Sequence, residues 1–318
     1  MRSVVALALS LSPVHGDRQR PIIGILSVPS EHGDCDTLSQ SSPPDATSCF
    51  HSLYASWLEA AGAQVAPVPF DLPPDRFDAL VGALNGALIT GGETNLGSLA
   101  SPYMQAASRL YNASLTRHSH GESWPLWGTC MGMQVLSILG ADDSSVLLSH
   151  AYDSEGLVLP IHLTADAHTS RLLCEGCLLP AGALATLTKH NSTVNLHHDG
   201  VPPTAFMPTT RLGSAFRVLS TNVDRKGKAF ASTIEARGGA PIWGVQWHPE
   251  RPVYDWQPEN VNFPRSEGVA LAMYAVAARF VREARQNRRA FRNAQAEASA
   301  LIYNWQPIGK TSYRAYYF

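Results

Sequence analysis

The segment Trp124-Pro-Leu-Trp-Gly128-Thr-Cys130-Met-Gly132-Met-Gln134 combines an apolar run, a cysteine flanked by glycines and the start of a helical pattern. This order is typical of a strand that turns sharply into a helix and presents a nucleophile at the turn. The two glycines allow a backbone conformation and a close approach that side chains would block. A thiol beside a helix N-terminus is favoured as the thiolate, because the helix dipole and free N–H groups stabilise negative charge there. We therefore interpret Cys130 as a nucleophile rather than as a small buried structural residue.

Strand-like and helix-like segments alternate on both sides of this turn. Besides the strand that begins at Trp124, the pattern predicts strands at 21–27, 64–69 and 86–90, and helices at 52–61, 74–84, 101–117 and 131–139. Such βαβ alternation predicts an α/β fold with a mostly parallel central sheet and helices on both faces. Ligands of these sheets bind at the carboxyl ends of the strands, so Cys130 and the turn Gly91-Gly92 should lie at that edge. After His150 the pattern is richer in strands, and no linker interrupts it.

A second polar motif follows another apolar strand, in Pro241-Ile-Trp-Gly-Val-Gln-Trp247-His248-Pro249-Glu250. A cysteine nucleophile needs a base, and the base works best when a third group fixes its tautomer. His248 can accept the thiol proton, while Glu250 can orient the imidazole through its other nitrogen. Proline between them removes an N–H donor and holds its own φ, which helps to fix how the two side chains project. The two motifs together predict a Cys–His–Glu site for acyl transfer.

The composition excludes several other classes of protein. Apolar residues make up 45% of the 318 positions and charged residues 16%, which is typical of a compact globular chain. The net charge is −2, and the arginines between 279 and 292 are interpreted as a solvated helix face without interleaved aromatic residues, so no nucleic-acid partner is expected. No segment approaches the roughly 20 apolar residues of a membrane span. Gly91-Gly92-Glu93 lacks the spacing and lysine of a phosphate-binding loop, and no metal or organic cofactor is expected.

Residues 1–16 are organised like a secretory signal peptide. Arg2 supplies a positive start, residues 4–11 are apolar, and Val14-His-Gly16 offers small residues at a cleavage site. We therefore predict a signal peptide at 1–16, a single catalytic domain over 17–318, and a location in the secretory pathway. Two glycosylation sequons fit this route: Asn112-Ala-Ser114 and Asn191-Ser-Thr193.

The five cysteines fit an oxidising compartment. Four of them can form two disulfides, which leaves one free thiol, and the motif indicates that this thiol is Cys130. Cys35 with Cys49 would close a loop rich in serine and proline. Cys174 and Cys177 are expected to form a local disulfide; a redox pair is the alternative, and half a zinc site is disfavoured because no second cysteine pair completes it.

On these motifs the chain resembles the class I glutamine amidotransferase-like superfamily and, within it, the γ-glutamyl hydrolases that cleave poly-γ-glutamate from folates. The resemblance runs from about Arg20 to the C-terminal region and rests on Arg20-Pro-Ile-Ile-Gly-Ile-Leu-Ser27, Tyr54 to Pro69, Gly86-Ala-Leu-Ile-Thr-Gly-Gly92, Trp-Gly-Thr-Cys130, Asn195-Leu-His197, Gly244-Val-Gln-Trp-His248-Pro-Glu250 and Ala300-Leu-Ile-Tyr303. It implies hydrolysis of γ-glutamyl bonds in folylpoly-γ-glutamates and antifolate polyglutamates through a thioester. It also implies an extracellular, lysosomal or vacuolar location, and it is compatible with a homodimer.

The same resemblance implies Cys130 as nucleophile, His248 as general base and Glu250 as the residue that orients it. It adds His197, in its Asn-x-His context, as a second histidine of the site. The family tends to place an aromatic residue soon after that histidine, whereas this chain continues His198-Asp199-Gly200, so His198 is an alternative.

Two further expectations concern the substrate. Gln134 resembles the amidotransferase pattern Cys-x-Gly-x-Gln, at a position where the hydrolases often carry an acid. The oxyanion of the reaction needs N–H donors about 3 Å away. We expect the Met131 N–H at the helix start and a backbone N–H from the turn Gly91-Gly92 to supply them.

Hydrolysis has two alternatives on this fold. A glutaminase subunit that delivers ammonia is disfavoured by the signal peptide and by the absence of a synthase domain from the chain. A non-catalytic binding protein on the same fold is disfavoured by the intact Cys–His–Glu set. The predicted partner is thus a small-molecule substrate, with neither nucleic acid nor a membrane span.

Overall fold

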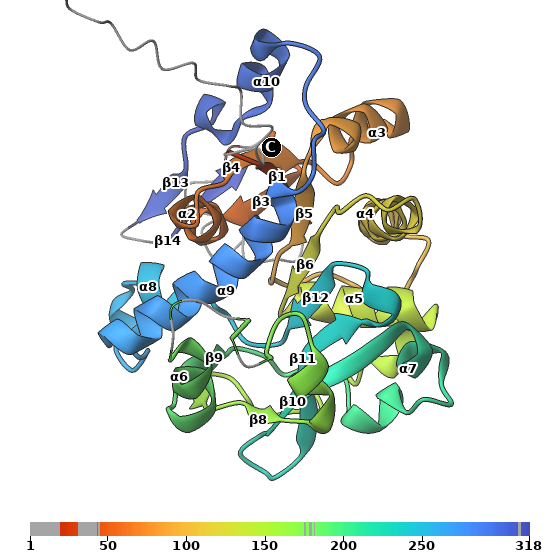
Figure 1. Ribbon diagram of the computed structural model, residues 1–318. Helices are drawn as coiled ribbons and strands as arrows, with labels where there is room; N and C mark the ends of the chain where they lie inside the picture. Colours follow the sequence, from red (N-terminus) through yellow and green to blue (C-terminus); the bar gives the residue numbers. More distant parts are fainter. Residues whose placement is uncertain are drawn as a thin grey trace, which may run out of the picture.

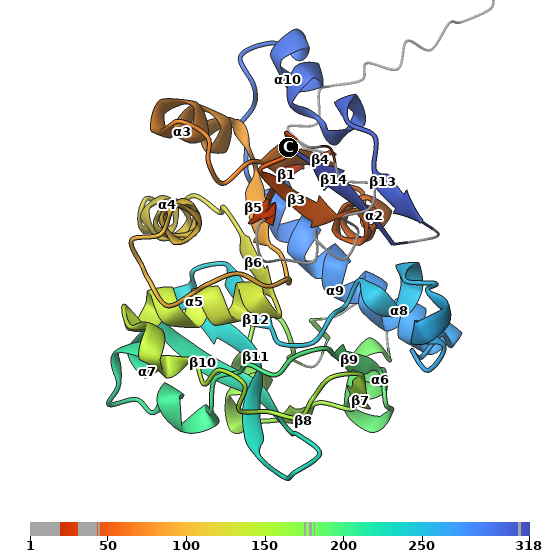
Figure 2. The same ribbon diagram turned by 180° about the vertical axis from the view of Figure 1, so that it is seen from behind.

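The computed structural model describes residues 20–30, 43, 45–174, 176–177, 180, 182–310 and 313–318. The predicted signal peptide and Cys35 lie outside the described residues. The central sheet has eight strands among the described residues (Figures 1 and 2), in the order β4 (Gln64–Val68), β1 (Ile22–Leu26), β5 (Gly86–Ile89), β6 (Leu126–Thr129), β12 (Ile242–Val245), β11 (Ala229–Ala236), β10 (Phe216–Val223) and β8 (His162–Leu163). The first five are parallel, and the last three pair antiparallel.

Two smaller sheets accompany the central one in the described part of the chain. One contains β13 (Ile308–Lys310), β14 (Tyr313–Tyr317), β3 (Ser48–His51) and β2 (Val28–Pro29). The other pairs β7 (Leu157–Leu159) with β9 (Thr193–Asn195), and β9 leads directly into the predicted histidines 197 and 198.

Helices cover both faces of the central sheet. They are α2 (Ser52–Ala60), α3 (Pro74–Ala83), α4 (Pro102–Ser119), α5 (Met131–Ala141), α6 (Ala183–Lys189), α7 (Arg211–Ala215), α8 (Arg251–Tyr254), α9 (Glu267–Arg285) and α10 (Ala294–Ala300). One hydrophobic cluster joins the sheet to α3, α4, α5 and α7, and a second joins it to α2, α6 and α9. Helix α9 lies in front of the central strands in Figure 1 and behind them in Figure 2. Among the described residues, no helix has both the length and the apolar character needed to cross a bilayer.

Strand β1 shows why the sheet needs cover on both sides. Successive side chains of a strand point to opposite faces. Ile22 and Leu26 accordingly pack into the first cluster, whereas Ile23 and Ile25 pack into the second, and all four are fully buried. Parallel strands buried on both faces have continuous apolar sequences, which is the pattern of this segment. The predicted α/β fold with a mostly parallel sheet is confirmed.

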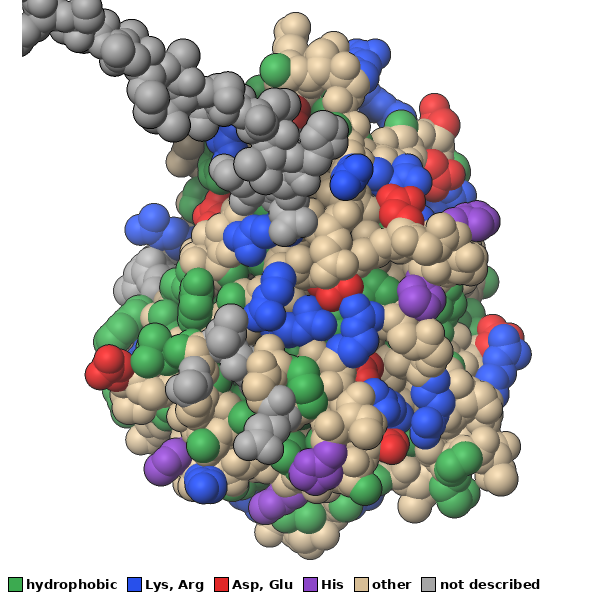
Figure 3. Space-filling model, in the orientation of Figure 1, with side chains coloured by type: hydrophobic (Ala, Val, Ile, Leu, Met, Phe, Trp, Pro, Cys, Tyr) green, Lys and Arg blue, Asp and Glu red, His purple; other side chains and the backbone are tan. Residues whose placement is uncertain are grey.

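The interpretation of the arginines near the C-terminus as one solvated helix face is wrong for Arg279. Its side chain is buried, and Nη1 pairs with Glu283 at 2.9 Å. The helix ends at Arg285, so the later arginines continue beyond it, and Arg289 pairs with Glu122. Basic and acidic side chains are interspersed on the face shown in Figure 3. Charge pairing, rather than solvation alone, therefore accounts for part of this arginine-rich segment.

Candidate active site

Cys130 lies at the junction between β6 and α5. Its N–H donates to the carbonyl oxygen of Val245 at 2.7 Å, which extends the pairing of β6 with β12 by one residue. The next residue, Met131, begins α5. The backbone of Cys130 has φ 51° and ψ −108°, an unusual conformation for a residue with a Cβ, and such positions cost about 1–3 kcal/mol and cluster at functional sites. The predicted nucleophile turn is present.

Gly132 lets the start of α5 pack against the end of β5. A Cβ on this glycine would lie 2.2 Å from the carbonyl oxygen of Ile89 and 3.1 Å from that of Thr90. Both neighbours are backbone atoms, so neither can move aside as the end of a flexible side chain could. This contact brings the turn Gly91-Gly92, which follows β5, beside Cys130.

His248 and Glu250 form the expected pair after β12. His248 Nδ1 lies 2.6 Å from Glu250 Oε1, and the side chains of both residues are almost completely buried. Burial alone lowers the pKa of His248, but the charge of Glu250, together with the charge and hydrogen bond of Cys130, outweighs it and raises the pKa to about 10. A Cβ on Gly91 would lie 2.8 Å from His248 Cε1 and 3.2 Å from Cys130 Cβ, so the histidine and the cysteine flank one glycine. The arrangement suits a thiolate–imidazolium pair oriented by a carboxylate.

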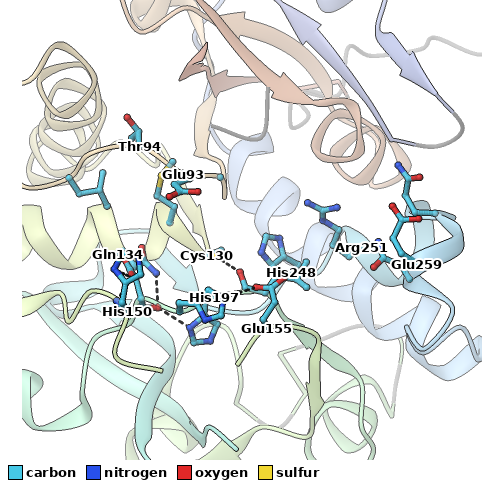
Figure 4. Close-up of a pocket in the computed structure, with 18 residues that line it drawn as sticks. Glu93, Thr94, Cys130, Gln134, His150, Glu155, His197, His248, Arg251 and Glu259 are labelled. Carbon is cyan, nitrogen blue, oxygen red and sulfur yellow. Dashed lines mark hydrogen bonds and ion pairs between the residues drawn. The ribbon is translucent and has the colours of Figure 1, made fainter. Parts of the chain in front are cut away.

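A cavity of about 520 Å³ opens in front of these residues (Figure 4). The predicted site residues that line it are Gly92, Cys130, Met131, Gln134, His197 and His248. Cys130 follows β6, His248 follows β12 and His197 follows β9, so separate strands deliver the side chains to one place. Gly91 and Glu250 lie just behind this layer, in contact with His248. The structure thus brings together all of the residues that the sequence indicated.

His197, rather than His198, is the inward-facing histidine. His197 is 4% exposed, and its Nδ1 lies 2.8 Å from the carbonyl oxygen of Asp199. A carbonyl oxygen can only accept, so Nδ1 carries the proton, and Nε2 of the neutral ring carries the lone pair. Nε2 is buried and has no hydrogen-bond partner among the described residues. The side chain of His198, by contrast, is 57% exposed and lies near Glu155 at the rim.

The burial of His197 predicts a pH-dependent stability. Burial, the largest influence, lowers the pKa of His197 from 6.5 to about 4, although the hydrogen bond to Asp199 acts in the opposite direction. Between these two values the unfolded chain binds a proton that the folded chain excludes, so the free energy of unfolding falls as the pH decreases through this window. We expect His197→Gln to reduce that loss by roughly 3 kcal/mol between pH 7 and pH 4.

Urea denaturation at pH 7, 5.5 and 4 measures this effect. The exposed residue His190 supplies the control variant His190→Gln, which should follow the parent chain at every pH. Parallel stability curves for the parent and His197→Gln would contradict the assignment of a neutral, buried His197.

One contact excludes one of the N–H groups that the sequence offers as oxyanion donors. The N–H of Gly91 donates to the hydroxyl oxygen of Tyr54 at 2.8 Å, so this N–H is already engaged. Gly92 and Met131 both line the cavity. The N–H at the first position of a helix has no intrahelical acceptor, which leaves that of Met131 available to an oxyanion. Gly92 and Met131 therefore remain the expected oxyanion donors.

Sequence reasoning assigned no role to Gln246, although it lies in the quoted histidine motif. Gln246 is completely buried, and its Nε2 lies 3.5 Å from the Cys130 sulphur. Gln134 Nε2 donates to the carbonyl oxygen of Asp199 at 3.0 Å and to Gln246 Oε1 at 3.4 Å. The sequence feature that marks Gln246 is a polar residue within an apolar segment, between Val245 and Trp247. The pattern alone does not show what such a residue contacts.

The cysteines are distributed as expected where the structure describes them. Cys174 and Cys177 form a disulfide, which confirms the local pairing. Cys49 is also disulfide-bonded, while Cys35, its predicted partner, lies outside the described residues. Cys130 is a free, buried cysteine. The one predicted nucleophile is thus available as a thiol.

A cysteine at a strained strand–helix turn, a buried His–Glu pair and a cavity at the carboxyl ends of parallel strands are the features of a cysteine-dependent acyl-transfer enzyme on the class I glutamine amidotransferase-like fold. Comparison with known proteins agrees with this class. The chain belongs to the peptidase C26 family, whose model matches residues 21–250.

Similar proteins include γ-glutamyl hydrolases from distant organisms. The human γ-glutamyl hydrolase is 34% identical over 304 residues, which cover 95% of this chain and 90% of the relative. γ-Glutamyl hydrolase B of Dictyostelium discoideum is 27% identical over 95% of this chain and 82% of its own length. Among solved structures, the glutaminase domain of Trypanosoma brucei CTPS with bound acivicin matches 84% of this chain and 95% of that domain, with a TM-score of 0.50 and 14% identity. The last similarity shows the fold alone.

Proposed function

We propose that this chain is a cysteine-dependent γ-glutamyl hydrolase that acts on folylpoly-γ-glutamates and antifolate polyglutamates. Its membership of the peptidase C26 family and its similarity to γ-glutamyl hydrolases support the bond that is cleaved. The observation that carries the proposal is the buried set of Cys130, His248 and Glu250 beside the cavity. The folate or antifolate group attached to the glutamyl chain goes beyond these similarities and is proposed in addition.

In the first half of the reaction, the Cys130 thiolate attacks the γ-carbonyl carbon of the substrate. The carbonyl oxygen becomes an oxyanion, and the N–H groups of Met131 and Gly92 can stabilise it. His248, which holds the proton as an imidazolium, protonates the amine as the C–N bond breaks. The glutamate or glutamyl chain that carries this amine leaves, and the shortened acyl part of the substrate remains bound to sulphur as a γ-glutamyl thioester.

In the second half, water replaces the amine beside His248. The imidazole, now neutral, takes a proton from this water as the oxygen attacks the thioester carbonyl carbon. The C–S bond breaks, the thiolate leaves and the γ-carboxylic acid is released. Glu250 keeps the imidazole of His248 in the same tautomer throughout, because its carboxylate accepts the hydrogen bond from His248 Nδ1. His248 Nε2 is thereby left to exchange protons with the reacting groups.

His197 is suited to bind the substrate rather than to transfer a proton. Its lone pair on Nε2 faces no donor among the described residues, and the residue lines the cavity. An N–H of a γ-glutamyl chain would satisfy this buried acceptor, which otherwise costs free energy. Because burial lowers the pKa of His197 to about 4, the acceptor persists over a wide pH range.

A glutaminase is the second candidate, since free glutamine offers the same γ-carbonyl carbon. A hydrolase should use binding energy from the additional glutamyl residues, whereas a glutaminase has no use for them. We expect kcat/KM for a folate polyglutamate to exceed that for glutamine by roughly 10²-fold or more. Parallel assays of product release measure the ratio, and a matched α-linked glutamyl peptide serves as the control that should not be cleaved. Equal or faster turnover of glutamine would reject the hydrolase in favour of the glutaminase.

The cellular setting and the oligomeric state belong to the same proposal. The signal-like residues 1–16 and the disulfide between Cys174 and Cys177 support the secretory pathway, with an extracellular, lysosomal or vacuolar destination. Both sequon asparagines, Asn112 and Asn191, are exposed. Mass measurement before and after glycosidase treatment tests this route. A homodimer is included on the resemblance to γ-glutamyl hydrolases, and light scattering tests it.

A further inference from the structure

We propose that the side-chain amide of Gln246 donates a hydrogen bond to the sulphur of Cys130 in its thiolate form, and that Gln134 holds this amide in the orientation that does so. The inference deepens the proposed function and rests on the role of Cys130 as nucleophile. Gln246 touches the reacting sulphur and is therefore a catalytic residue. Gln134 acts through Gln246 and is a positioning residue.

The contacts form one chain that ends at the sulphur. Gln246 Nε2 lies 3.5 Å from Cys130 Sγ, and both side chains are buried. Gln246 Oε1 accepts from Gln134 Nε2 at 3.4 Å, and the same Nε2 donates to the carbonyl oxygen of Asp199 at 3.0 Å. An amide nitrogen carries two hydrogens, so Gln134 can make both bonds at once.

This chain of contacts determines which way each amide points. The carbonyl oxygen of Asp199 can only accept, so Gln134 must turn its NH₂ group toward it. That NH₂ group also faces Gln246, which must therefore present its oxygen to Gln134. The NH₂ group of Gln246 is left facing the sulphur. Without Gln134, the oxygen of Gln246 could face the sulphur instead and would repel a thiolate.

A neutral donor adds something that His248 does not provide. The imidazolium stabilises the thiolate but loses its proton when the amine leaves, whereas the amide of Gln246 keeps its hydrogens throughout. It can therefore stabilise the sulphur both before attack and when the thioester breaks. The titratable and charged residues that line the same cavity are Glu93, His150, Glu155, His197, His198, Asp199, His248, Arg251 and Glu259, and Glu250 lies behind His248. A glutamine-to-methionine replacement changes none of their charges.

Alkylation of Cys130 by iodoacetamide tests the donor without any substrate. The rate constant is measured from pH 4 to pH 10 by mass spectrometry of the Cys130 peptide, in the full chain with its disulfides intact. Gln246→Met keeps the approximate size but cannot donate, and we expect it to raise the pH midpoint of alkylation by about one unit, a tenfold change in the ionisation equilibrium. Gln246→Glu, which keeps the shape of the side chain, should raise the midpoint further, because a carboxylate would face the sulphur. It serves as the second variant if Gln246→Met does not fold.

Two controls separate the chemistry from stability. Ser137→Ala removes a completely buried hydroxyl one turn further along α5, where it donates to the Met133 carbonyl oxygen at 2.9 Å. It should lower the melting temperature and leave the midpoint unchanged. Gln295→Met replaces an exposed glutamine on α10 and should change neither. A folded Gln246→Met or Gln246→Glu chain with the parent midpoint would overturn the proposal.

Gln134→Met tests the positioning role. It should raise the midpoint by a smaller amount, about half a unit, and the double replacement with Gln246→Met should add nothing to the effect of Gln246→Met alone. Additive shifts would show that Gln134 does not act through Gln246. Because alkylation needs no γ-glutamyl compound, a shifted midpoint in a chain that hydrolyses none would reject the proposed function and keep this inference. Normal hydrolysis by the parent chain with unshifted midpoints in the variants would support the proposed function and reject the role of Gln246.

Discussion

Replacing Cys130 with alanine is expected to lower the hydrolysis of a poly-γ-glutamyl folate by about 10⁵-fold or more. The reaction proceeds through a thioester, and the described residues contain no other free cysteine. Water attacking directly would lack both the nucleophile and the covalent intermediate that divides the reaction into two easier steps. Chromatography of the glutamate products, followed for hours at high enzyme concentration, measures the residual rate.

The melting temperature of Cys130→Ala shows whether the variant keeps its fold and serves as the control. Removing the sulphur leaves a small side chain at a strained position, so the melting temperature should stay within a few degrees of the parent value. Cys130→Ser, which keeps a hydroxyl of similar size, should be almost as inactive, because a hydroxyl is far harder to ionise than a thiol. Turnover within tenfold of the parent by either variant would show that the nucleophile lies elsewhere.

Replacing His248 with alanine is expected to lower kcat/KM by about 10⁴-fold. The variant loses the proton donor for the leaving amine and the cation beside the thiolate. It also leaves Glu250 buried without its nearest partner, since the 2.6 Å contact with Nδ1 disappears. Initial rates at saturating and limiting substrate, measured from pH 4 to pH 9, separate the loss in kcat from any change in KM.

The expected pattern is a large fall in kcat with a modest change in KM. Because the charges of Glu250 and Cys130 raise the pKa of His248 to about 10, the parent chain should retain the imidazolium throughout this pH range, and its rate should not fall on the alkaline side. His190→Ala removes an exposed histidine and should match the parent. A His248→Ala chain that retains a tenth of the parent kcat would contradict its role as acid and base.

The sequence predicted the parts of the site that depend on local patterns. The apolar run before Cys130, the glycines beside it and the helical spacing after it each reflect contacts close in the chain, and the structure places β6 and α5 accordingly. The same holds for His248 and Glu250, which are two residues apart and follow one strand. A neighbouring strand and helix leave a periodic record in sequence, so such features can be predicted.

The contacts that could not be predicted join residues far apart in the sequence. The hydroxyl of Tyr54 accepts the Gly91 N–H across 37 positions, and nothing around either residue indicates the other. Gln246 lies 116 positions from the cysteine whose sulphur it contacts. The buried Arg279 likewise hydrogen-bonds the carbonyl oxygen of Arg171, on a segment 108 positions away. Packing of distant segments decides these pairs, and one sequence carries no record of which segments meet.

One backbone atom has a consequence for experiments that scan the site by substitution. The carbonyl oxygen of Asp199 accepts hydrogen bonds from both Gln134 and His197, yet every residue at position 199 would offer the same oxygen. Substitution at that position would therefore test the side chain, whose Oδ1 accepts the His150 N–H at 2.6 Å, and would not remove the carbonyl that holds Gln134 and His197.

The placement of this oxygen depends, besides that side-chain contact, on backbone hydrogen bonds to the neighbouring segment 148–152. Leu148 and Gly200 exchange two backbone hydrogen bonds, of 2.9 and 3.2 Å, and the N–H of Tyr152 donates to the carbonyl oxygen of His198 at 2.9 Å. Changes that break these backbone bonds, such as Leu148→Pro or Tyr152→Pro, are expected to move the carbonyl of Asp199 and to alter two site residues together. Natural variation in substrate preference among relatives of this chain should accordingly be sought in that segment as well as among the side chains that line the cavity.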